Sequence, residues 1–347
     1  MTARATDPSP SRRTPGELLL DVRGLTVTYR SGRDSVFAAR GVDIALAPGE
    51  TLGMAGESGS GKTTVAMSLL RLLPADALVT GEIRFHGEDL LQANWARMRS
   101  VRWAEASVVF QGAMSALNPV RSVGDQIVEP ILLHEKVGEK AARARARDLL
   151  DSVGVPSRRV GSYPHELSGG QRQRVMMAMA LACDPDLLIA DEPTTALDVI
   201  VQAQILTLLT DLVRERGISL IMISHDLSVL ASTCDRIAVM YAGRLVETGP
   251  SRQVIGSPLH PYSRALAGAF PTLGDPASRL APGGLPGDPP DLRERIDGCP
   301  FAPRCPEVEE RCRSGEVPLL ELEGGRAAAC LHAPGYDQGR DRAVSRG

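Results

Sequence analysis

Residues 49–64 read GETLGMAGESGSGKTT, and this stretch decides the fold of the chain. Within it, residues 56–63 match the phosphate-binding pattern G-x-x-x-x-G-K-T. The apolar run Thr51–Ala55 before the loop predicts a buried strand, and the apolar-periodic segment Thr64–Leu73 after it predicts a helix that ends before Pro74. A strand, a glycine-rich loop and a helix in this order are the structural context that the pattern needs.

The residue types of this loop suit a nucleoside triphosphate. Small residues let successive backbone N–H groups curl around a phosphate, and the positive end of the following helix faces the same anion. Lys62 adds a positive charge between the terminal phosphates, and the Thr63 hydroxyl can ligate magnesium. A Gly/Ser connection that spells the pattern by chance is the alternative, and the flanking strand and helix argue against it. The residues expected to bind the nucleotide are Gly56, Glu57, Ser58, Gly59, Ser60, Gly61, Lys62, Thr63 and Thr64.

Length and composition limit the remaining possibilities. The 347 residues, 43% of them hydrophobic, suffice for one large domain and a smaller one. No apolar run approaches the roughly 20 residues of a membrane span. Residues 1–17 lack the apolar centre of a signal peptide, so we expect a disordered leader on a cytoplasmic protein. A net charge of -3 and an aromatic content of 3% argue against nucleic acid as the main partner.

The segments on either side of the loop differ in character. Alternating apolar residues predict short antiparallel strands before the loop, at Leu20–Tyr29, Val36–Ala39 and Val42–Leu46, and a further hairpin around Ile83, Phe85 and Gly87. Residues 94–182 are predicted to form a mainly helical insertion, with one helix at Glu139–Val153 that Gly154 stops. The expected fold is therefore α/β: a P-loop NTPase core with a mostly parallel sheet, an antiparallel β subdomain and a helical insertion.

The sequence Leu167-Ser168-Gly169-Gly170-Gln171 opens the last predicted helix of the insertion. Ser168 and Gln171 have the spacing of a capping box, which accounts for those two residues. It does not account for two glycines in the first turn, each of which costs about 1 kcal/mol of helix propensity relative to alanine. Glycines at a helix N-terminus are useful where an anion must approach the backbone closely.

Two further apolar runs end in polar residues that could do chemistry. Leu187–Ala190 is followed by Asp191-Glu192, and Ser219–Ser224 is followed by His225. Such continuous apolar runs are typical of strands covered on both faces. Together with the phosphate loop, three candidate groups thus follow presumed parallel strands, at the edge where open α/β sheets place their ligands.

Taken together, these motifs resemble the ATP-binding subunit of ABC transporters over residues 18–262. The matching elements occur in order: Walker A (Gly56 to Thr63), the Q-loop (Gln111 in Val109-Phe110-Gln111), the LSGGQ signature (Leu167 to Gln171), Walker B (Leu187 to Glu192), the D-loop (Ala196-Leu197-Asp198) and the H-loop (His225). The signature is the most specific of them.

The resemblance implies a role for each matching residue. Tyr29 matches the aromatic residue that stacks on adenine, although a lone strand tyrosine can also serve packing alone. Asp191 matches the carboxylate that holds Mg2+, and Glu192 matches the general base that polarises the attacking water. Because adjacent strand residues point to opposite sides, the two carboxylates can serve different atoms.

Two more residues complete the implied site. His225 matches the residue that contacts the γ-phosphate and positions the water. Gln111 matches the switch that reaches both magnesium and the membrane subunit. After the glutamine, Gly112-Ala113 stands where the family more usually has Asp-Pro. This departure affects the expected stiffness of the loop but not the expected role of the glutamine.

In proteins that this chain resembles, two ATP molecules are buried in a head-to-tail pair of subunits. Transition-state charge would then meet Lys62, His225 and magnesium of one subunit, and Ser168 and Gly170 of the facing one. One chain alone is expected to hydrolyse ATP poorly. ATP binding would close the pair and hydrolysis would reopen it, which would move a membrane partner.

Further segments are similar to the dipeptide/oligopeptide importer branch of the family: Ser115 to Pro119, Val123 to Gln126, Tyr163 to Leu167, Thr194 to Val199 and the tail from Gly298 to Pro306. This resemblance implies a D-type subunit at the cytoplasmic face of the inner membrane. Its partners would be a homologous F-type ATPase, two permeases and an extracytoplasmic solute-binding protein. Nickel or a glycoside as the cargo, an exporter, and a soluble ABC ATPase without transport function remain alternatives.

The tail holds four of the six cysteines. After a linker from Pro271 to Asp291, they follow the spacing C-x5-C-x6-C-x17-C, at Cys299, Cys305, Cys312 and Cys330. Disulfides are not expected in a reducing cytosol, and the C-x2-4-C knuckle that is usual for zinc is absent. The spacing and the resemblance favour a 4Fe-4S cluster, with zinc or no metal as alternatives. Cys183 and Cys234 are expected in the core. The extension and its linker span residues 263–335, and a disordered tail, 336–347, follows.

Overall fold

The computed structural model describes residues 17–31, 34–112, 116–194, 197–269, 287–294 and 296–337. Nearly all of the expected leader, most of the linker and most of the expected tail lie outside these ranges. So do Ala113, Ser115, Thr195 and Ala196 of the sequence motifs. Within the described residues the strands form two sheets, one of eight strands and one of four.

The larger sheet has the order β11-β12-β10-β9-β3-β8-β7-β6. Its parallel part joins β6, β7, β8, β3 and β9, and β10 then pairs antiparallel with β9. Every residue of β3, β7 and β8 is buried, as their unbroken apolar sequences predict. The bounds are β3 (Thr51–Ala55), β6 (Ala106–Val109), β7 (Leu187–Asp191), β8 (Ser219–Ile223), β9 (Arg236–Tyr241) and β10 (Arg244–Pro250).

The smaller sheet is antiparallel and has the order β2-β1-β4-β5. It consists of β1 (Leu20–Ser31), β2 (Asp34–Leu46), β4 (Leu78–Phe85) and β5 (Glu88–Asp89). The antiparallel subdomain and its later hairpin are thus confirmed, but β2 is one strand where the sequence suggested two. The chain continues through Gly41, which takes a positive φ of 62° at a register shift instead of ending the strand.

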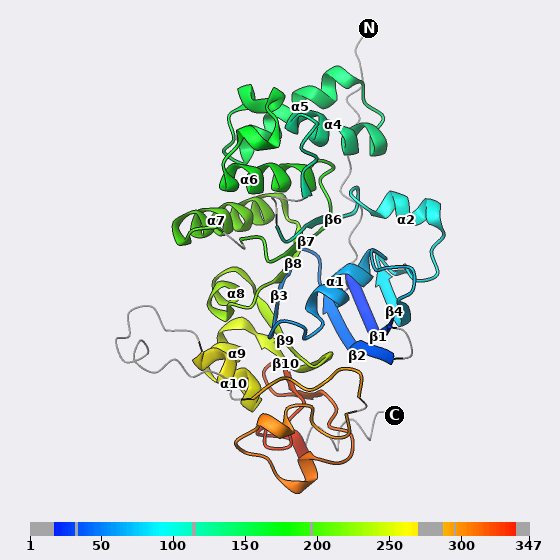
Figure 1. Ribbon diagram of the computed structural model, residues 1–347, viewed down its shortest axis with the longest axis vertical. Coiled ribbons are helices and arrows are strands. Elements are labelled where there is room, and N and C mark those ends of the chain that lie inside the picture. Colours follow the sequence, from blue (N-terminus) through cyan, green and yellow to red (C-terminus); the bar gives the residue numbers. More distant parts are fainter. Residues whose placement is uncertain are drawn as a thin grey trace.

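The helices are α1 (Lys62–Leu69), α2 (Trp95–Val101), α4 (Val123–His134), α5 (Glu139–Ser152), α6 (Gly169–Ala180), α7 (Val199–Arg216), α8 (Leu227–Thr233), α9 (Ser251–Gly256) and α10 (Pro261–Gly268), with 3-10 turns η1 (Ser157–Gly161), η2 (Pro164–Glu166), η3 (Ala302–Arg304) and η4 (Glu310–Cys312). Helices α4, α5 and α6 gather at one end of the molecule, and residues 296–337 lie at the other end (Figure 1). Helix α1 begins two residues before the predicted start and ends well before Pro74, because Arg71 takes a positive φ of 51°.

One strand contradicts the expected helical insertion over residues 94–182. Residues Ala106–Val109 form β6, which pairs in parallel with β7 at the edge of the large sheet. A mostly buried run of four residues, Ala-Ser-Val-Val, is too short to show a strand period, so its sequence does not distinguish strand from helix. Helix α2 precedes this strand, and the other helices of the insertion, α4 to α6, follow Gln111, which comes directly after β6.

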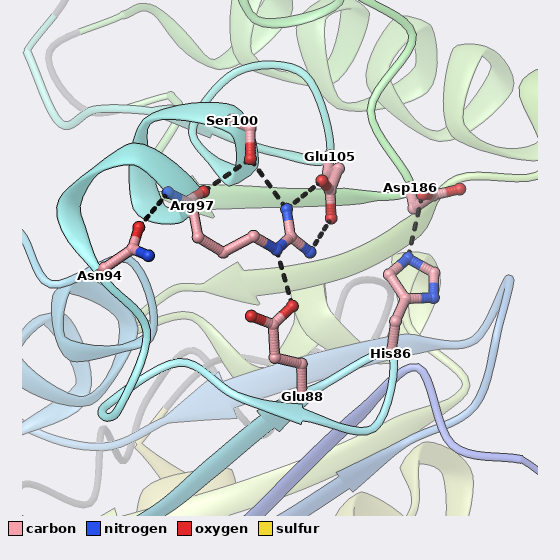
Figure 2. Close-up of polar contacts among 7 residues, drawn as sticks. All are labelled: His86, Glu88, Asn94, Arg97, Ser100, Glu105 and Asp186. Carbon is pink, nitrogen blue, oxygen red and sulfur yellow. Dashed lines mark hydrogen bonds and ion pairs between the residues drawn. The ribbon is translucent and has the colours of Figure 1, made fainter.

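A polar network joins the two sheets (Figure 2). Arg97 on α2 donates to Glu88 of β5 at 2.6 Å and binds both carboxylate oxygens of Glu105, which precedes β6. His86 lies 3.1 Å from Asp186, just before β7. Since Glu105 and Asp186 stand at the amino ends of their strands, this junction leaves the carboxyl ends of the sheet open.

The tail extends the large sheet. Strands β11 (Leu320–Leu322) and β12 (Arg326–Ala328) form a hairpin, and β12 pairs with β10. Glu247 of β10 is fully buried, accepts the N–H groups of Leu259 and His260, and pairs with Arg326 at 2.9 Å. The cysteine-bearing extension is therefore packed on the ATPase core through main-chain pairing and a buried ion pair.

Candidate functional site

The phosphate loop lies between β3 and α1, as the sequence predicts. Its backbone is curled tightly: a Cβ on Gly61, whose φ is 102°, would stand 2.1 Å from the carbonyl oxygen of Ala38. The Lys62 ammonium donates to the carbonyls of Gly56 and Glu57, both at 2.8 Å, and lies 3.2 Å from the Ser60 hydroxyl. The loop is thus closed around its own lysine.

Asp191 ends β7 beside this loop. Burial raises the pKa of its carboxyl group, while a hydrogen bond with Thr63 lowers it. Among the described residues, the buried Asp191 Oδ1 has no hydrogen-bond partner. An unpaired buried carboxylate oxygen next to a threonine hydroxyl is the donor set that a hard cation such as Mg2+ takes. Residues Thr63 and Asp191 therefore fit the predicted magnesium site.

Burial also lowers the pKa of the Lys62 ammonium, whereas Glu192, Asp191 and Glu57 oppose that effect. The positive charge of Lys62 is thus partly desolvated and faces the two carboxylates at the end of β7. A desolvated cation of this kind attracts an incoming phosphate more strongly than a solvated one does.

Glu192 is the centre of the polar contacts at this edge of the sheet. Its carboxylate accepts a hydrogen bond of 2.8 Å from Gln111, and His225 Nδ1 lies 3.2 Å away. Gln111 follows β6, Glu192 follows β7 and His225 follows β8, so three neighbouring strands bring them together. This arrangement can hold a water molecule between a carboxylate, an amide and an imidazole.

The two adjacent carboxylates do have different neighbours, but strand alternation is not the reason. Glu192 lies just beyond the end of β7 and takes a φ of 43°, in the left-handed region that glutamate rarely adopts. The chain leaves the strand at this residue, which turns Glu192 toward His225 and leaves Asp191 beside Thr63.

Tyr29 of β1 lies next to the helix that follows the loop. Its hydroxyl is 3.2 Å from that of Thr64, and its ring is partly buried against the core. The position is compatible with both readings of this tyrosine, as an adenine platform or as a packing residue.

The signature residues Ser168, Gly169, Gly170 and Gln171 begin α6. The capping box is confirmed: Gln171 N–H donates to Ser168 Oγ, and Ser168 N–H donates to Gln171 Oε1. One glycine has a packing reason that the sequence did not reveal, because a Cβ on Gly170 would stand 2.8 Å from Val201 Cγ1. Among the described residues, no hydrogen bond joins this segment to the phosphate loop of the same chain.

The four tail cysteines do meet. Cys299, Cys305, Cys312 and Cys330 line one small cavity together with His260 and His332, and we call this set the cysteine pocket. Burial raises the pKa of Cys299 to about 11, with further contributions from the charges of the other three thiols. Yet no group of three or more His, Cys, Asp or Glu side chains within the described ranges is arranged to hold a metal ion, so a preformed metal site is not borne out.

The two remaining cysteines have no part in this pocket. Burial raises the pKa of Cys183 to about 11 and that of Cys234 to about 12. Cys234 belongs to the hydrophobic core and Cys183 packs against it, as the sequence predicted.

Two residues that the sequence did not single out contact the phosphate loop, one from α10 and one from the tail. Tyr262 Oη accepts the N–H of Glu57 at 2.8 Å, and Arg304 pairs with the Glu57 carboxylate. A spacing of more than 200 residues leaves no periodic signal. The charge of Glu57 inside an otherwise small-residue loop was the one hint of a partner.

Fold and site together define a P-loop ATPase that uses ATP and Mg2+. The sequence profile of the family described as ABC transporter matches residues 39–195, and that of the oligopeptide/dipeptide transporter C-terminal region matches residues 246–312. The chain belongs to the ATP-binding proteins of ABC transporters, in the group with this C-terminal region.

Named relatives agree with this assignment. The oligopeptide transport ATP-binding protein OppD of Escherichia coli is 45% identical over 324 residues, which cover 93% of this chain and 95% of that protein. OppD of Salmonella typhimurium is 45% identical over 319 residues, covering 91% and 94%. The structure of the dimeric ATP-binding cassette MJ0796 bound to ADP and phosphate aligns with a TM-score of 0.61 and 27% identity, over 67% of this chain and 99% of the cassette.

Within the part of the chain that the structure describes, no helix has the length and apolar character needed to cross a membrane.

Proposed function

We propose that this chain is the D-type ATP-hydrolysing subunit of an ABC importer that takes up di- and oligopeptides through separate membrane permeases. The observation that carries the proposal is the contact of Glu192 with both Gln111 and His225, in a chain that also has the oligopeptide-type extension. The names of the OppD relatives support peptide as the cargo. In this proposal the transported solute does not contact the ATPase subunit. The experiment described below therefore distinguishes peptide from nickel or another small solute as the cargo.

The residues at the edge of the sheet have separable roles in this proposal. Lys62 and the backbone of residues 56–61 bind the phosphates, and Tyr29 contacts the base. When bound, Mg2+ neutralises charge on the terminal phosphates, and Thr63, Asp191 and Gln111 would hold it. Glu192 accepts a proton from the attacking water, and His225 orients that water and the γ-phosphate.

Catalysis in this proposal needs a second ATPase. The signature at the start of α6 makes no hydrogen bond to the phosphate loop of its own chain, among the residues described, and its N-terminal N–H groups suit an anion. We propose that Ser168, Gly169, Gly170 and Gln171 cap the ATP of a homologous F-type subunit. The dimeric cassette MJ0796 supports such a pairing.

The remaining partners are two transmembrane permeases and an extracytoplasmic solute-binding protein, with no nucleic acid. The chain would sit peripherally at the cytoplasmic face of the inner membrane. Gln111, which bonds Glu192 and leads into the helical insertion, would report the state of the ATP site to the permease.

We further propose a 4Fe-4S cluster in the cysteine pocket, with zinc or no metal as alternative outcomes. The support is that all four tail thiols line a single cavity, which is the number and type of ligands that such a cluster takes. Cys299, Cys305, Cys312 and Cys330 would hold it.

Affinity purification of a trapped complex tests the transport role. The variant Glu192→Gln, which is expected to bind ATP and hydrolyse it slowly, would be expressed with an affinity tag in the native host cell. It would then be recovered from a detergent extract in the presence of ATP and magnesium. Two polytopic permeases, a second ATPase and a solute-binding protein are the expected companions, and ligands eluted from the binding protein would identify the cargo. Lys62→Ala, which lacks the phosphate contact, is the matched control. Recovery of ribosomes or DNA-repair proteins without membrane proteins would overturn the proposal.

A further inference from the structure

A side chain of the tail contacts the phosphate loop directly. Arg304 ends the turn η3, between Cys299 and Cys305, and Ala302 of the same turn lines the cysteine pocket. From there the Arg304 guanidinium forms a two-pronged ion pair with Glu57 of the phosphate loop, with N···O distances of 2.8 and 3.1 Å. The two residues are 247 positions apart.

The arginine of this ion pair is sheltered from solvent, whereas the Glu57 side chain is 28% exposed. The Arg304 side chain is only 5% exposed, and its guanidinium lies 5.8 Å from the ring centre of Tyr241 and 6.0 Å from that of Phe301. Nη1 also donates to the Tyr241 hydroxyl at 3.2 Å. The hydrogen bond to Glu57 is the main reason that the pKa of Arg304 rises above its usual value. Two-pronged pairs of this kind set orientation as well as charge balance.

Glu57 is held at two points. Its carboxylate binds Arg304, and its backbone N–H donates to Tyr262 Oη at 2.8 Å. The backbone carbonyl of Glu57 also accepts a hydrogen bond from the ammonium group of Lys62, the proposed phosphate-binding lysine. The tail therefore acts on the residue that also orients the phosphate-binding lysine.

A second contact braces the other side of the loop. Phe37 N–H and the Arg40 side chain on β2 donate to the Leu292 carbonyl, and Arg40 also donates to that of Glu294. Ala38, between them, is the residue whose carbonyl backs Gly61 of the phosphate loop. Segments of the extension thus support both strand β2 and the loop itself.

We propose that Arg304 is a positioning residue for nucleotide binding, which holds Glu57 in place and thereby couples the packing of the cysteine-bearing extension to ATP affinity. The inference rests on the ATP-binding role of the loop. Because coupling free energies are reciprocal, ATP bound at the loop also stabilises the extension. Couplings of this type typically change affinity about 5- to 150-fold.

A double-mutant cycle on the full chain tests the pair. The variants are Arg304→Met, Glu57→Gln and the double variant, and the measurement is the dissociation constant of a fluorescent ATP analogue with magnesium. We expect each single variant to weaken binding about tenfold and the double variant to be no weaker than either, since both changes break one contact. Arg264→Met is the matched control, because Arg264 also pairs with a tail carboxylate, Glu307, but both of these side chains are exposed and Glu307 is not part of the phosphate loop.

Hydrogen exchange gives a readout that a loss of packing alone does not produce. ATP with magnesium is expected to slow amide exchange in residues 296–312 of the parent chain and not of Arg304→Met. Unchanged ATP affinity in Arg304→Met and Glu57→Gln, effects that multiply in the double variant, or an equal ATP response of the tail in both proteins would each overturn the proposal. If Arg304→Met does not fold, Glu57→Gln tests the contact from the loop side. ATP binding by the parent, measured in the same titration, tests the proposed function separately.

Discussion

The side-chain amide of Gln111 donates a hydrogen bond of 2.8 Å to the carboxylate of Glu192, although 81 residues separate them. The bond joins the loop after β6, which leads into the helical insertion, to the end of β7. We therefore expect a change at Glu192 on ATP hydrolysis to alter the position of the insertion.

Glu192→Gln removes the proposed proton acceptor and keeps the size of the side chain. We expect ATP hydrolysis to fall at least about 100-fold, since general-base catalysis typically contributes that much or more, while ATP affinity stays within a few-fold of the parent. Phosphate release and nucleotide titration measure the two quantities. Glu139→Gln, on the exposed start of α5, is the control and should hydrolyse ATP normally. Equal hydrolysis in both variants would exclude Glu192 as the base.

Asp191→Asn removes a buried charge whose oxygen Oδ1 lacks a hydrogen-bond partner among the described residues. The variant should need more Mg2+ for activity, yet be more stable than the parent in the absence of nucleotide and magnesium. Its pH dependence has a definite sign. Burial raises the pKa of Asp191 above that of the unfolded chain, so the native state binds the proton more tightly and loses stability as pH rises through that pKa.

The stability advantage of Asp191→Asn is therefore greatest at neutral pH and shrinks on acidification. Urea unfolding at a series of pH values measures it. Asp211→Asn, at an exposed position of α7, should show no such trend. An Asp191→Asn protein that is less stable than the parent at neutral pH would contradict the assignment of a desolvated, unpaired carboxylate.

Gly170→Ala tests the packing of the signature helix. A Cβ there would stand 2.8 Å from Val201 Cγ1, whereas one on the neighbouring Gly169 would be 3.5 Å from Leu197. We expect Gly170→Ala to lower the free energy of unfolding by about 1–3 kcal/mol, as overpacking does, and Gly169→Ala to raise it by up to about 1 kcal/mol through helix propensity. Val201→Ala should reverse much of the loss in the double variant. Denaturant unfolding measures all four proteins, and equal stability of the two glycine variants would refute the clash.

The cysteine pocket predicts a measurable composition. Anaerobically purified chain should contain about four iron and four sulfide ions and absorb broadly in the visible range. Cys312→Ser should lose most of the iron, whereas Cys183→Ser, which alters a cysteine outside the pocket, should keep it. Parent protein without iron or sulfide would rule out the iron–sulfur proposal, and one zinc per chain would favour the alternative.

Several features were readable from local sequence because they depend on neighbouring residues. The strand β3 matches its predicted bounds, α5 ends within one residue of its prediction, and the capping box at Ser168 forms as expected. Backbone dihedrals, caps and burial on both faces of a strand each leave a short-range pattern, and the nucleotide-binding motif is itself such a pattern.

Only the tertiary structure decided which residues meet when they lie far apart in the sequence. The order of strands brings Gln111, Glu192 and His225 together, packing sets Gly170 against Val201, and the fold of the tail carries Arg304 to Glu57. Sequence spacing carries no information on such pairs, because their distance depends on how whole elements pack. The sequence by itself thus determined the chemistry available to this protein, and the packing of its strands and tail determined which of those groups meet.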